Sequence, residues 1–287
     1  MRQFVPAGAG GLTGLGLVAT LATTVSEAQQ LRILHVDGDT FFASCEIAMD
    51  ASLSGRPVWV GGGRTGDGIV IAANRLAKRF GTAEERFRHI YESNHWSEDE
   101  SVSGPGSTME ETEPIRRELP SLLKELGATS LLDLPCGDFH WMQHTDLSGI
   151  DYIGGDLVGE LIERNQARHA RDGVSFRKLD LVHDKLPQVD AVLCRDCLVH
   201  LSFADAHVAL ANVVRSGAGW LLTTSFPSVE RNDDIVTGQW RPLNLTRPPF
   251  NLPEPAKRIA ENCTETEFAD KVLGVWPVAD LTQAGGS

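Results

Sequence analysis

Three carboxylates, Asp133, Asp156 and Asp180, each close a short apolar run in the second half of the chain. Carboxylates accept hydrogen bonds from hydroxyl and amino groups. An acid at the end of the second of several neighbouring strands can accept both hydroxyls of a ribose, and the third acid would then accept from an adenine amino group. Taken singly, each acid is equally consistent with a turn, a helix cap or a solvated strand end. Their order along the chain favours a ligand that contains a nucleoside.

Two loops would complete such a site. Asp133 stands in the turn LDLPCGD at 132–138, where Gly137 lets the backbone come close to a small ligand. A fourth apolar run leads into CRDCLVHLS at 194–202, where Asp196 and His200 would face the reactive end of the ligand. His200 is also consistent with a structural histidine that precedes a helix. These two side chains are the candidates for contact with a second substrate.

The same loop has the spacing Cys194-x-x-Cys197-x-x-His200, which is open to a metal or a redox interpretation. A closed zinc site needs four ligands, and no second pair at finger-like spacing follows. A redox pair between a strand and a helix stays open as an alternative. Cysteines buried at the end of a strand are the simpler interpretation.

Alternating elements must position these residues. Short apolar runs predict strands at 130–134, 152–155, 174–179, 191–194 and 220–225. Apolar residues at helical spacing predict helices near 115–126 and 203–214, the second capped by Ser202 with Asp205. Strands that alternate with helices indicate βαβ units and a parallel sheet. Ligands of such sheets bind at the carboxyl ends of the strands.

Composition limits the class of protein. The chain has 287 residues, a net charge of −13 and 41% hydrophobic residues, which predicts a globular protein of about two domains. Residues 82–287 carry 33 acidic and 19 basic side chains. This balance argues against nucleic acid as a partner of that part, because binding to phosphates rests on Lys and Arg. The five scattered cysteines predict a reducing compartment, and we expect a cytoplasmic location.

The N-terminal part differs in pattern from the rest. Residues 1–30 are expected to be a disordered leader, with a weak signal peptide as the alternative. No run reaches the roughly 18 apolar residues of a membrane span, so we expect no membrane partner. We divide the remainder into a small α/β segment at 31–81, a linker together with the N-terminal segment of the main domain at 82–110, and the main domain itself at 111–283. These patterns do not predict an oligomeric state.

About two thirds of the chain, 90–281, resembles a bacterial family of class I S-adenosylmethionine-dependent methyltransferases. The motifs that carry the resemblance are YESNHW at 91–96, SGPGS at 103–107, the turn at 132–138, the loop at 194–202 and TGQWRPLNL at 237–245. The resemblance implies a Rossmann-like seven-stranded sheet with helices on both faces. It also implies S-adenosylmethionine as the methyl donor.

The resemblance assigns the donor contacts residue by residue. It implies that Asp133 and the turn of Cys136, Gly137 and Asp138 hold the methionine end. Asp156 would bind the ribose and Asp180 the adenine. The donor's methyl group is already activated, so catalysis rests on orienting an acceptor, and a base is needed only where the acceptor loses a proton. Asp196 and His200 are our candidates for contacting the acceptor, which the sequence does not identify.

One further motif of this part is Arg247-Pro248-Pro249-Phe250. It is similar to the proline-proline-aromatic motif of enzymes that methylate a flipped base amine, but it follows the fifth predicted strand, whereas that motif follows the fourth. We therefore interpret it as a rigid polyproline turn that covers the site.

Residues 31–81 resemble the opening of Y-family translesion DNA polymerases of the UmuC and DinB type. The motifs are ILHVDGDTFFASCE at 33–46, LSGRPV at 53–58 and ANRLAKRFG at 73–81. The resemblance implies a fragment of a polymerase palm in which Asp37 and the carbonyl of Gly38 bind Mg²⁺ and Phe42 excludes a ribose hydroxyl. Two-metal phosphoryl transfer needs carboxylates from more than one strand, and the rest of such a polymerase has no room in the chain.

Three functions follow from these patterns. The first is a methyltransferase that uses S-adenosylmethionine and an unidentified acceptor. The alternative is a DNA-repair polymerase of the Y family that is inactive alone. The third is a non-catalytic module that binds a nucleoside ligand.

Overall fold

The computed structural model describes residues 59–61, 70–73, 83–92, 100–261, 263–264 and 266–281, together with Ala48. The chain divides into two compact units, Met1–Gly81 and Thr82–Ser287. In the first unit, β1 (Trp59–Gly61) pairs antiparallel with β2 (Val70–Ala73), within the segment predicted to be α/β. Asp37, Gly38 and Phe42 lie outside the described residues. No helix among the described residues has the length and apolar character to cross a membrane.

The second unit is built on a seven-stranded sheet in the order β5-β4-β3-β6-β7-β9-β8. Its strands are β3 (Ser130–Asp133), β4 (Asp151–Asp156), β5 (Val174–Lys178), β6 (Ala191–Cys194), β7 (Trp220–Ser225), β8 (Lys257–Ala260) and β9 (Val272–Pro277). The first five run parallel, whereas β9 is antiparallel to both β7 and β8. The predicted Rossmann-like α/β sheet is thereby confirmed.

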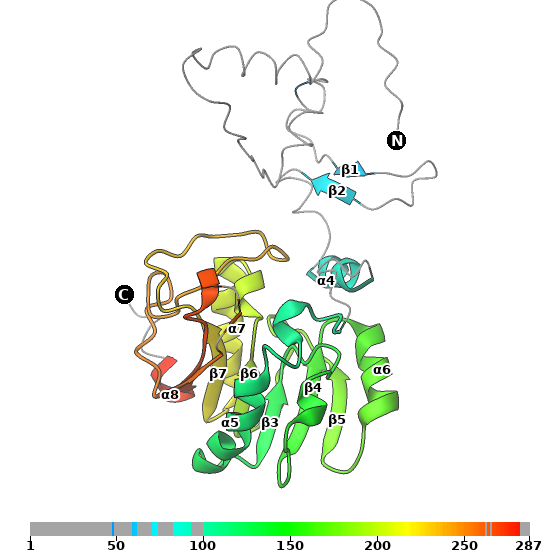
Figure 1. Ribbon diagram of the computed structural model, residues 1–287, viewed down its shortest axis with the longest axis vertical. Coiled ribbons are helices and arrows are strands. Elements are labelled where there is room, and N and C mark those ends of the chain that lie inside the picture. The colour runs from blue at the N-terminus through cyan, green and yellow to red at the C-terminus, as the bar shows by residue number, and fades with distance from the viewer. Residues whose placement is uncertain are drawn as a thin grey trace, which may run out of the picture. The chain divides into compact units, whose positions relative to one another are not determined.

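The order of the strands reverses beside β3. The chain runs outward from β3 to β4 and β5 and then returns to place β6 on the other side of β3. The loops after β3 and β6 consequently diverge, which leaves a crevice at the carboxyl ends of these strands. All of the parallel strands point their carboxyl ends toward this edge of the sheet (Figure 1).

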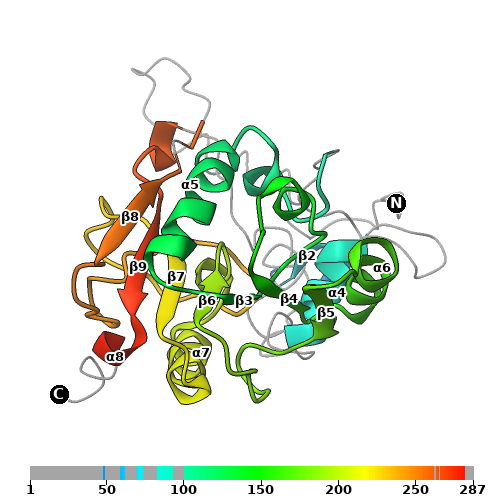
Figure 2. The same cartoon turned by 90° about the horizontal axis from the view of Figure 1, so that it is seen from below.

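Helices pack on both faces of the sheet. The helices of this unit are α5 (Glu113–Glu125), α6 (Gly159–His169), α7 (Phe203–Ser216) and the short α8 (Val278–Leu281), together with α4 (Ala83–Glu92), which lies at the carboxyl ends of the strands. Figure 2 shows α5 and α7 on opposite faces. Ile115 and Leu119 of α5 belong to one buried apolar cluster, and Ala206 and Ala209 of α7 belong to the other. The sheet is therefore covered on both sides, which parallel strands require.

Local signals explain where α7 begins and ends. The backbone N–H of Asp205 donates to the hydroxyl of Ser202 over 3.1 Å, which is the cap expected from the sequence. Gly217 ends the helix in the left-handed conformation at φ 78°. This cap fixes the end of the loop that leaves β6.

Candidate active site

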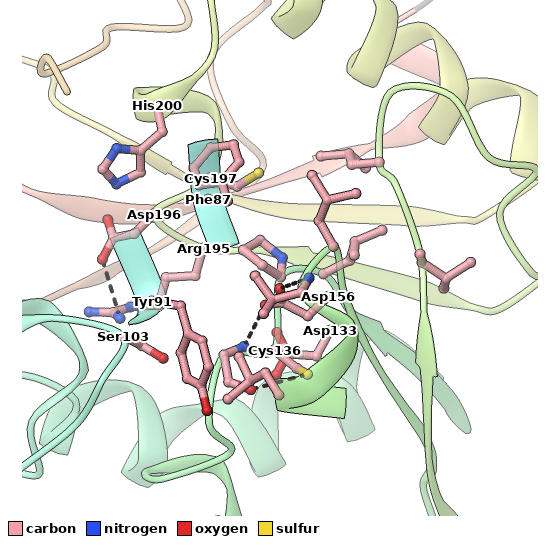
Figure 3. A pocket seen from close by; sticks show the side chains of 18 of the residues that line it. Phe87, Tyr91, Ser103, Asp133, Cys136, Asp156, Arg195, Asp196, Cys197 and His200 are labelled. Carbon is pink, nitrogen blue, oxygen red and sulfur yellow. Dashed lines mark hydrogen bonds and ion pairs between the residues drawn. The ribbon is translucent and has the colours of Figure 1, made fainter. Parts of the chain in front are cut away.

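A pocket opens at the carboxyl ends of β3, β4, β5 and β6, at the reversal in strand order (Figure 3). It brings together every site residue predicted in this unit: Asp133, Cys136, Gly137, Asp138, Asp156, Asp180, Asp196 and His200. The three strand-end acids thus share one cavity, as their order in the sequence suggested.

Asp156 ends β4 and is buried, with 7% of its surface exposed. Its carboxylate accepts the N–H of Gly137 over 3.2 Å and the N–H of Val158 over 2.9 Å. Burial nevertheless raises its pKa to about 6, because removal from water disfavours the charged form. The N–H of Leu157 is a third backbone hydrogen-bond donor to this carboxylate, and all three donors oppose the rise in its pKa.

Asp133 ends β3 and accepts a hydrogen bond of 2.6 Å from the phenol of Tyr152 on β4. Its carboxyl is 2% exposed, and burial raises its pKa to about 7 although Tyr152 and the charge of Arg195 oppose the rise. Burial therefore makes this carboxyl easier to protonate than that of an exposed aspartate.

The turn after β3 depends on glycine. Gly137 has φ +54°, and a Cβ there would lie 2.1 Å from the hydroxyl oxygen of Ser103. Asp138 holds the facing segment in place, because its carboxylate accepts from the Ser101 hydroxyl and the Val102 N–H over 3.0 and 3.1 Å. The Asn165 amide donates to the Gly137 carbonyl over 2.8 Å. The backbone of this turn is thus held against the pocket from both sides.

Two more of the residues predicted to bind the methyl donor, Asp180 and Cys136, form hydrogen bonds within the protein. The carboxylate of Asp180 accepts from the Val182 N–H over 2.7 Å and pairs with the His183 ring over 2.8 Å. The N–H of Cys136 donates to the Gly155 carbonyl over 2.7 Å, and burial raises the pKa of its thiol well above the usual range. Both residues line the pocket, while these contacts fix their loops.

Asp196, with 27% of its side chain exposed, lies in a group of four charges whose other members are buried, and we call the group the ion quartet: Arg195, Asp196, Glu261 and Lys271. The ammonium of Lys271 is 2.7 Å from the Asp196 carboxylate and 3.1 Å from that of Glu261. The Arg195 guanidinium is 2.6 Å from Glu261 and 3.3 Å from Asp196. Two positive and two negative charges therefore neutralise one another inside the protein.

The ion quartet changes the interpretation of Asp196. Although burial opposes it, the charges of Lys271 and Arg195 hold the pKa of Asp196 well below its usual range. Its N–H donates to the Thr224 hydroxyl over 2.8 Å, and its φ of +48° is uncommon for a residue with a side chain. A carboxylate that is paired in this way is a poor base. These contacts favour a positioning role for Asp196 over the direct acceptor contact expected from the sequence.

His200 stands at the other end of the β6 loop. Its Nδ1 lies 3.0 Å from the Gln239 carbonyl, so this nitrogen carries the proton of the neutral ring. Burial lowers the pKa of the imidazole, which keeps it neutral. Arg241 stabilises this part of the loop by donating to the carbonyls of Leu198 and Leu201 over 2.8 and 2.7 Å. The motif at 237–245 thus serves to hold the His200 turn.

Helix α4 supplies a wall that sequence reasoning missed. It lies within the segment 82–110, predicted to be a linker and the N-terminal segment of the main domain without a helix being assigned there, and Ala83, Phe87 and Tyr91 line the pocket. An ion pair of 2.6 Å between Glu84 and Lys178 holds α4 near the end of β5. The spacing of four residues was the available signal, since it places the three side chains on one face of a helix.

The cysteine motif does not form a metal site among the described residues, in which no cluster of three suitable ligands occurs. Cys194 and Cys197 are free thiols. A hydrogen bond with Cys194 and burial raise the pKa of Cys197 well above its usual range, which disfavours a reactive thiolate.

The motif at 247–250 lies away from the pocket, contrary to the expectation that it covers the site. Phe250 is buried against Phe203 and His207 of α7. None of the four residues lines the pocket, because this turn fills the core beneath α7.

Comparison with known proteins finds a family match in the N-terminal part of the chain. The impB/mucB/samB family model matches residues 36–88. A DNA polymerase IV of Halorhodospira halophila is 50% identical over 50 residues, which are 17% of this chain and 14% of that protein. The chain therefore spans about one seventh of the length of this relative, and the N-terminal unit is similar to a fragment of such polymerases.

Solved structures similar to the chain include methyltransferases. Human N-acetylserotonin methyltransferase in complex with S-adenosylmethionine matches 69% of this chain and 60% of its own, at 14% identity and a TM-score of 0.49. The methyltransferase domain of bacterial CtHen1 matches 58% of this chain and 98% of its own, at 14% identity and a TM-score of 0.43.

Proposed function

We propose that the second unit is a class I S-adenosylmethionine-dependent methyltransferase and that its pocket binds the methyl donor. The observation that carries this proposal is the convergence of Asp133, Asp156 and Asp180 on one pocket at the strand-order reversal. Such a crevice is where open α/β sheets bind nucleotides and related ligands.

The side chains that line the pocket fit a nucleoside that carries an amino-acid tail. Asp156 ends β4 inside the pocket, where its carboxylate could accept a hydrogen bond from a ribose hydroxyl. Leu157, Leu179 and Val182 line the pocket together with Asp180 and offer an apolar surface to a flat base. Asp133, next to the Gly137 turn, would face the ammonium group of the methionine end.

S-Adenosylmethionine supplies a methyl group on a sulfonium, which is already activated for transfer. The protein then has to orient the acceptor and exclude water. The β6 loop is suited to this because the ion quartet holds one end and Arg241 holds the other. His200 keeps its basic nitrogen at Nε2, where it would take a proton from an acceptor that must lose one.

Titration of the full chain with S-adenosylmethionine tests this function. We expect Asp156→Ala to weaken binding more than tenfold, or roughly 1.4 kcal/mol. Because the pKa of Asp156 is about 6, its carboxylate becomes protonated as the pH falls below that value and can no longer accept both hydroxyls. Protonation of Asp156 alone should therefore lower the wild-type affinity about tenfold between pH 7 and pH 5, and protonation of Asp133, whose pKa is about 7, adds to that fall and should persist in Asp156→Ala.

A matched control separates this effect from general damage. Asp151→Ala alters an exposed acid at the opposite end of the same strand and should leave the affinity unchanged. The pH step assigned to Asp156 should be missing from Asp156→Ala. Absence of binding to a folded wild-type chain would rule out the donor site.

The N-terminal unit favours a second candidate function, polymerisation by a Y-family fragment. The support is the family match at 36–88, which includes Asp37 and Gly38. Two-metal chemistry needs ligands from more than one segment, and Asp37 and Gly38 come from a single segment. The fragment would therefore need a second chain to complete the metal site.

Primer extension with Mg²⁺ tests that candidate. We expect the wild-type chain to extend a primer no faster than Asp37→Ala does. Extension by the wild type that Asp37→Ala abolishes would establish polymerase activity and displace the methyltransferase as the main function.

A further inference from the structure

The pocket has an aromatic wall on the side of α4. Ala83, Phe87 and Tyr91 lie on one face of this helix, and we call them the α4 wall. The Phe87 ring meets the His200 imidazole edge to face, with centroids 6.4 Å apart and planes at 89°. The Tyr91 ring lies 5.8 Å from the Arg164 guanidinium of α6. The wall therefore spans the pocket from α6 to the β6 loop, and its rings face the strand ends (Figure 3).

The charges around this pocket are unequal. Among the described residues that line it, the basic side chains are Arg195 and His200. The charge of Arg195 is matched within the ion quartet by Glu261 and Asp196. Burial keeps His200 neutral by lowering its pKa. The basic side chains of the lining are thus already neutralised. The lining also contains four carboxylates that do not belong to the ion quartet: Asp133, Asp138, Asp156 and Asp180.

The excess of carboxylates in the pocket lining favours some methyl acceptors over others. Among the described lining side chains, an anion that entered the pocket would find no unpaired cation to offset its lost hydration, which is costly. A neutral ring instead packs against aromatic side chains, whose edges and faces favour offset and perpendicular contacts. Buried sites for small molecules combine such apolar walls with a few polar groups that set orientation.

We propose that the methyl acceptor is a small uncharged molecule with an aromatic or similarly flat apolar ring, bound in the pocket against the α4 wall, beside the Phe87–His200 ring pair. The proposal rests on the donor site proposed above. Phe87 is then a specificity-determining residue, because its ring forms part of the apolar wall that the acceptor ring would contact. Phosphorylated and carboxylated acceptors are disfavoured by the four carboxylates of the lining.

A pair of probes of equal shape and different charge tests the proposal. 2-Naphthol is neutral at pH 7, whereas 2-naphthoate is an anion. We expect the full chain, saturated with S-adenosylhomocysteine, to bind 2-naphthol at least about tenfold more tightly than 2-naphthoate. Phe87→Ala should weaken 2-naphthol binding about tenfold or more, and should leave the affinity for S-adenosylhomocysteine within about twofold. Glu85→Gln, an exposed change on the same helix, should alter neither.

The failure of this proposal can be distinguished from that of the donor site. Equal or tighter binding of 2-naphthoate, or unchanged 2-naphthol binding in a folded Phe87→Ala variant, would overturn the acceptor class. If S-adenosylhomocysteine itself does not bind, the proposed function fails, and the naphthol comparison repeated without it still decides the preference of the pocket. No residue of α4 is fully buried, so Phe87→Ala is expected to fold.

Discussion

Replacing Gly137 with alanine is expected to weaken donor binding by about a hundredfold or more, or roughly 2.7 kcal/mol. The added Cβ would stand 2.1 Å from the Ser103 hydroxyl oxygen and 3.0 Å from the Ser103 Cβ, so the turn and the facing segment must separate. The N–H of Gly137 donates to Asp156, and the shift would break that bond at the proposed ribose site. Titration with S-adenosylmethionine measures the loss.

Gly149→Ala is the matched control for this change. Gly149 also has positive φ, +77°, but a Cβ there meets nothing within 4 Å. It therefore carries the same backbone penalty, about 1 kcal/mol, without the steric conflict. Equal effects of Gly137→Ala and Gly149→Ala on donor binding would show that the close approach to Ser103 is unimportant.

Lys271→Met should lower the free energy of unfolding by about 3–5 kcal/mol, because it leaves the ion quartet with two carboxylates and one cation. The Lys271 side chain is only 7% exposed and lies between Asp196 and Glu261. Lys271→Arg retains the positive charge and should recover part of the loss. Denaturation by urea, followed by circular dichroism, measures these differences.

Lys257→Met provides the comparison at the surface. Lys257 pairs with Glu125 over 2.6 Å, but the two side chains are 40% and 61% exposed. Water screens such pairs, so we expect a loss of about 0–1 kcal/mol. If Lys271→Met costs no more than Lys257→Met, the ion quartet does not stabilise the β6 loop.

The sheet could be predicted because its parallel strands are short apolar runs that are buried on both faces. The runs at 191–194 and 220–225 coincide with β6 and β7. The antiparallel strands β8 and β9 were not predicted. Alternating exposure along β8, where Ile259 is buried between exposed neighbours, gives only a weak signal over four residues.

The donor side of the site could likewise be predicted, because each acid follows its strand directly and strand ends meet at one edge of a sheet. The acceptor side could not. Lys271 is 75 residues from Asp196 in the sequence, and only the pairing of β9 with β7 brings it there. Helix α4 was missed because it is rich in charged residues and contains no buried position.

A crystal structure of the full chain with S-adenosylhomocysteine tests the donor site most directly. We expect both ribose hydroxyls within hydrogen-bonding distance of the Asp156 carboxylate, about 2.5–3.2 Å, and the adenine beside Asp180. A nucleoside bound elsewhere, or a ribose turned away from Asp156 in this pocket, would contradict the assignment of the second unit as a methyltransferase.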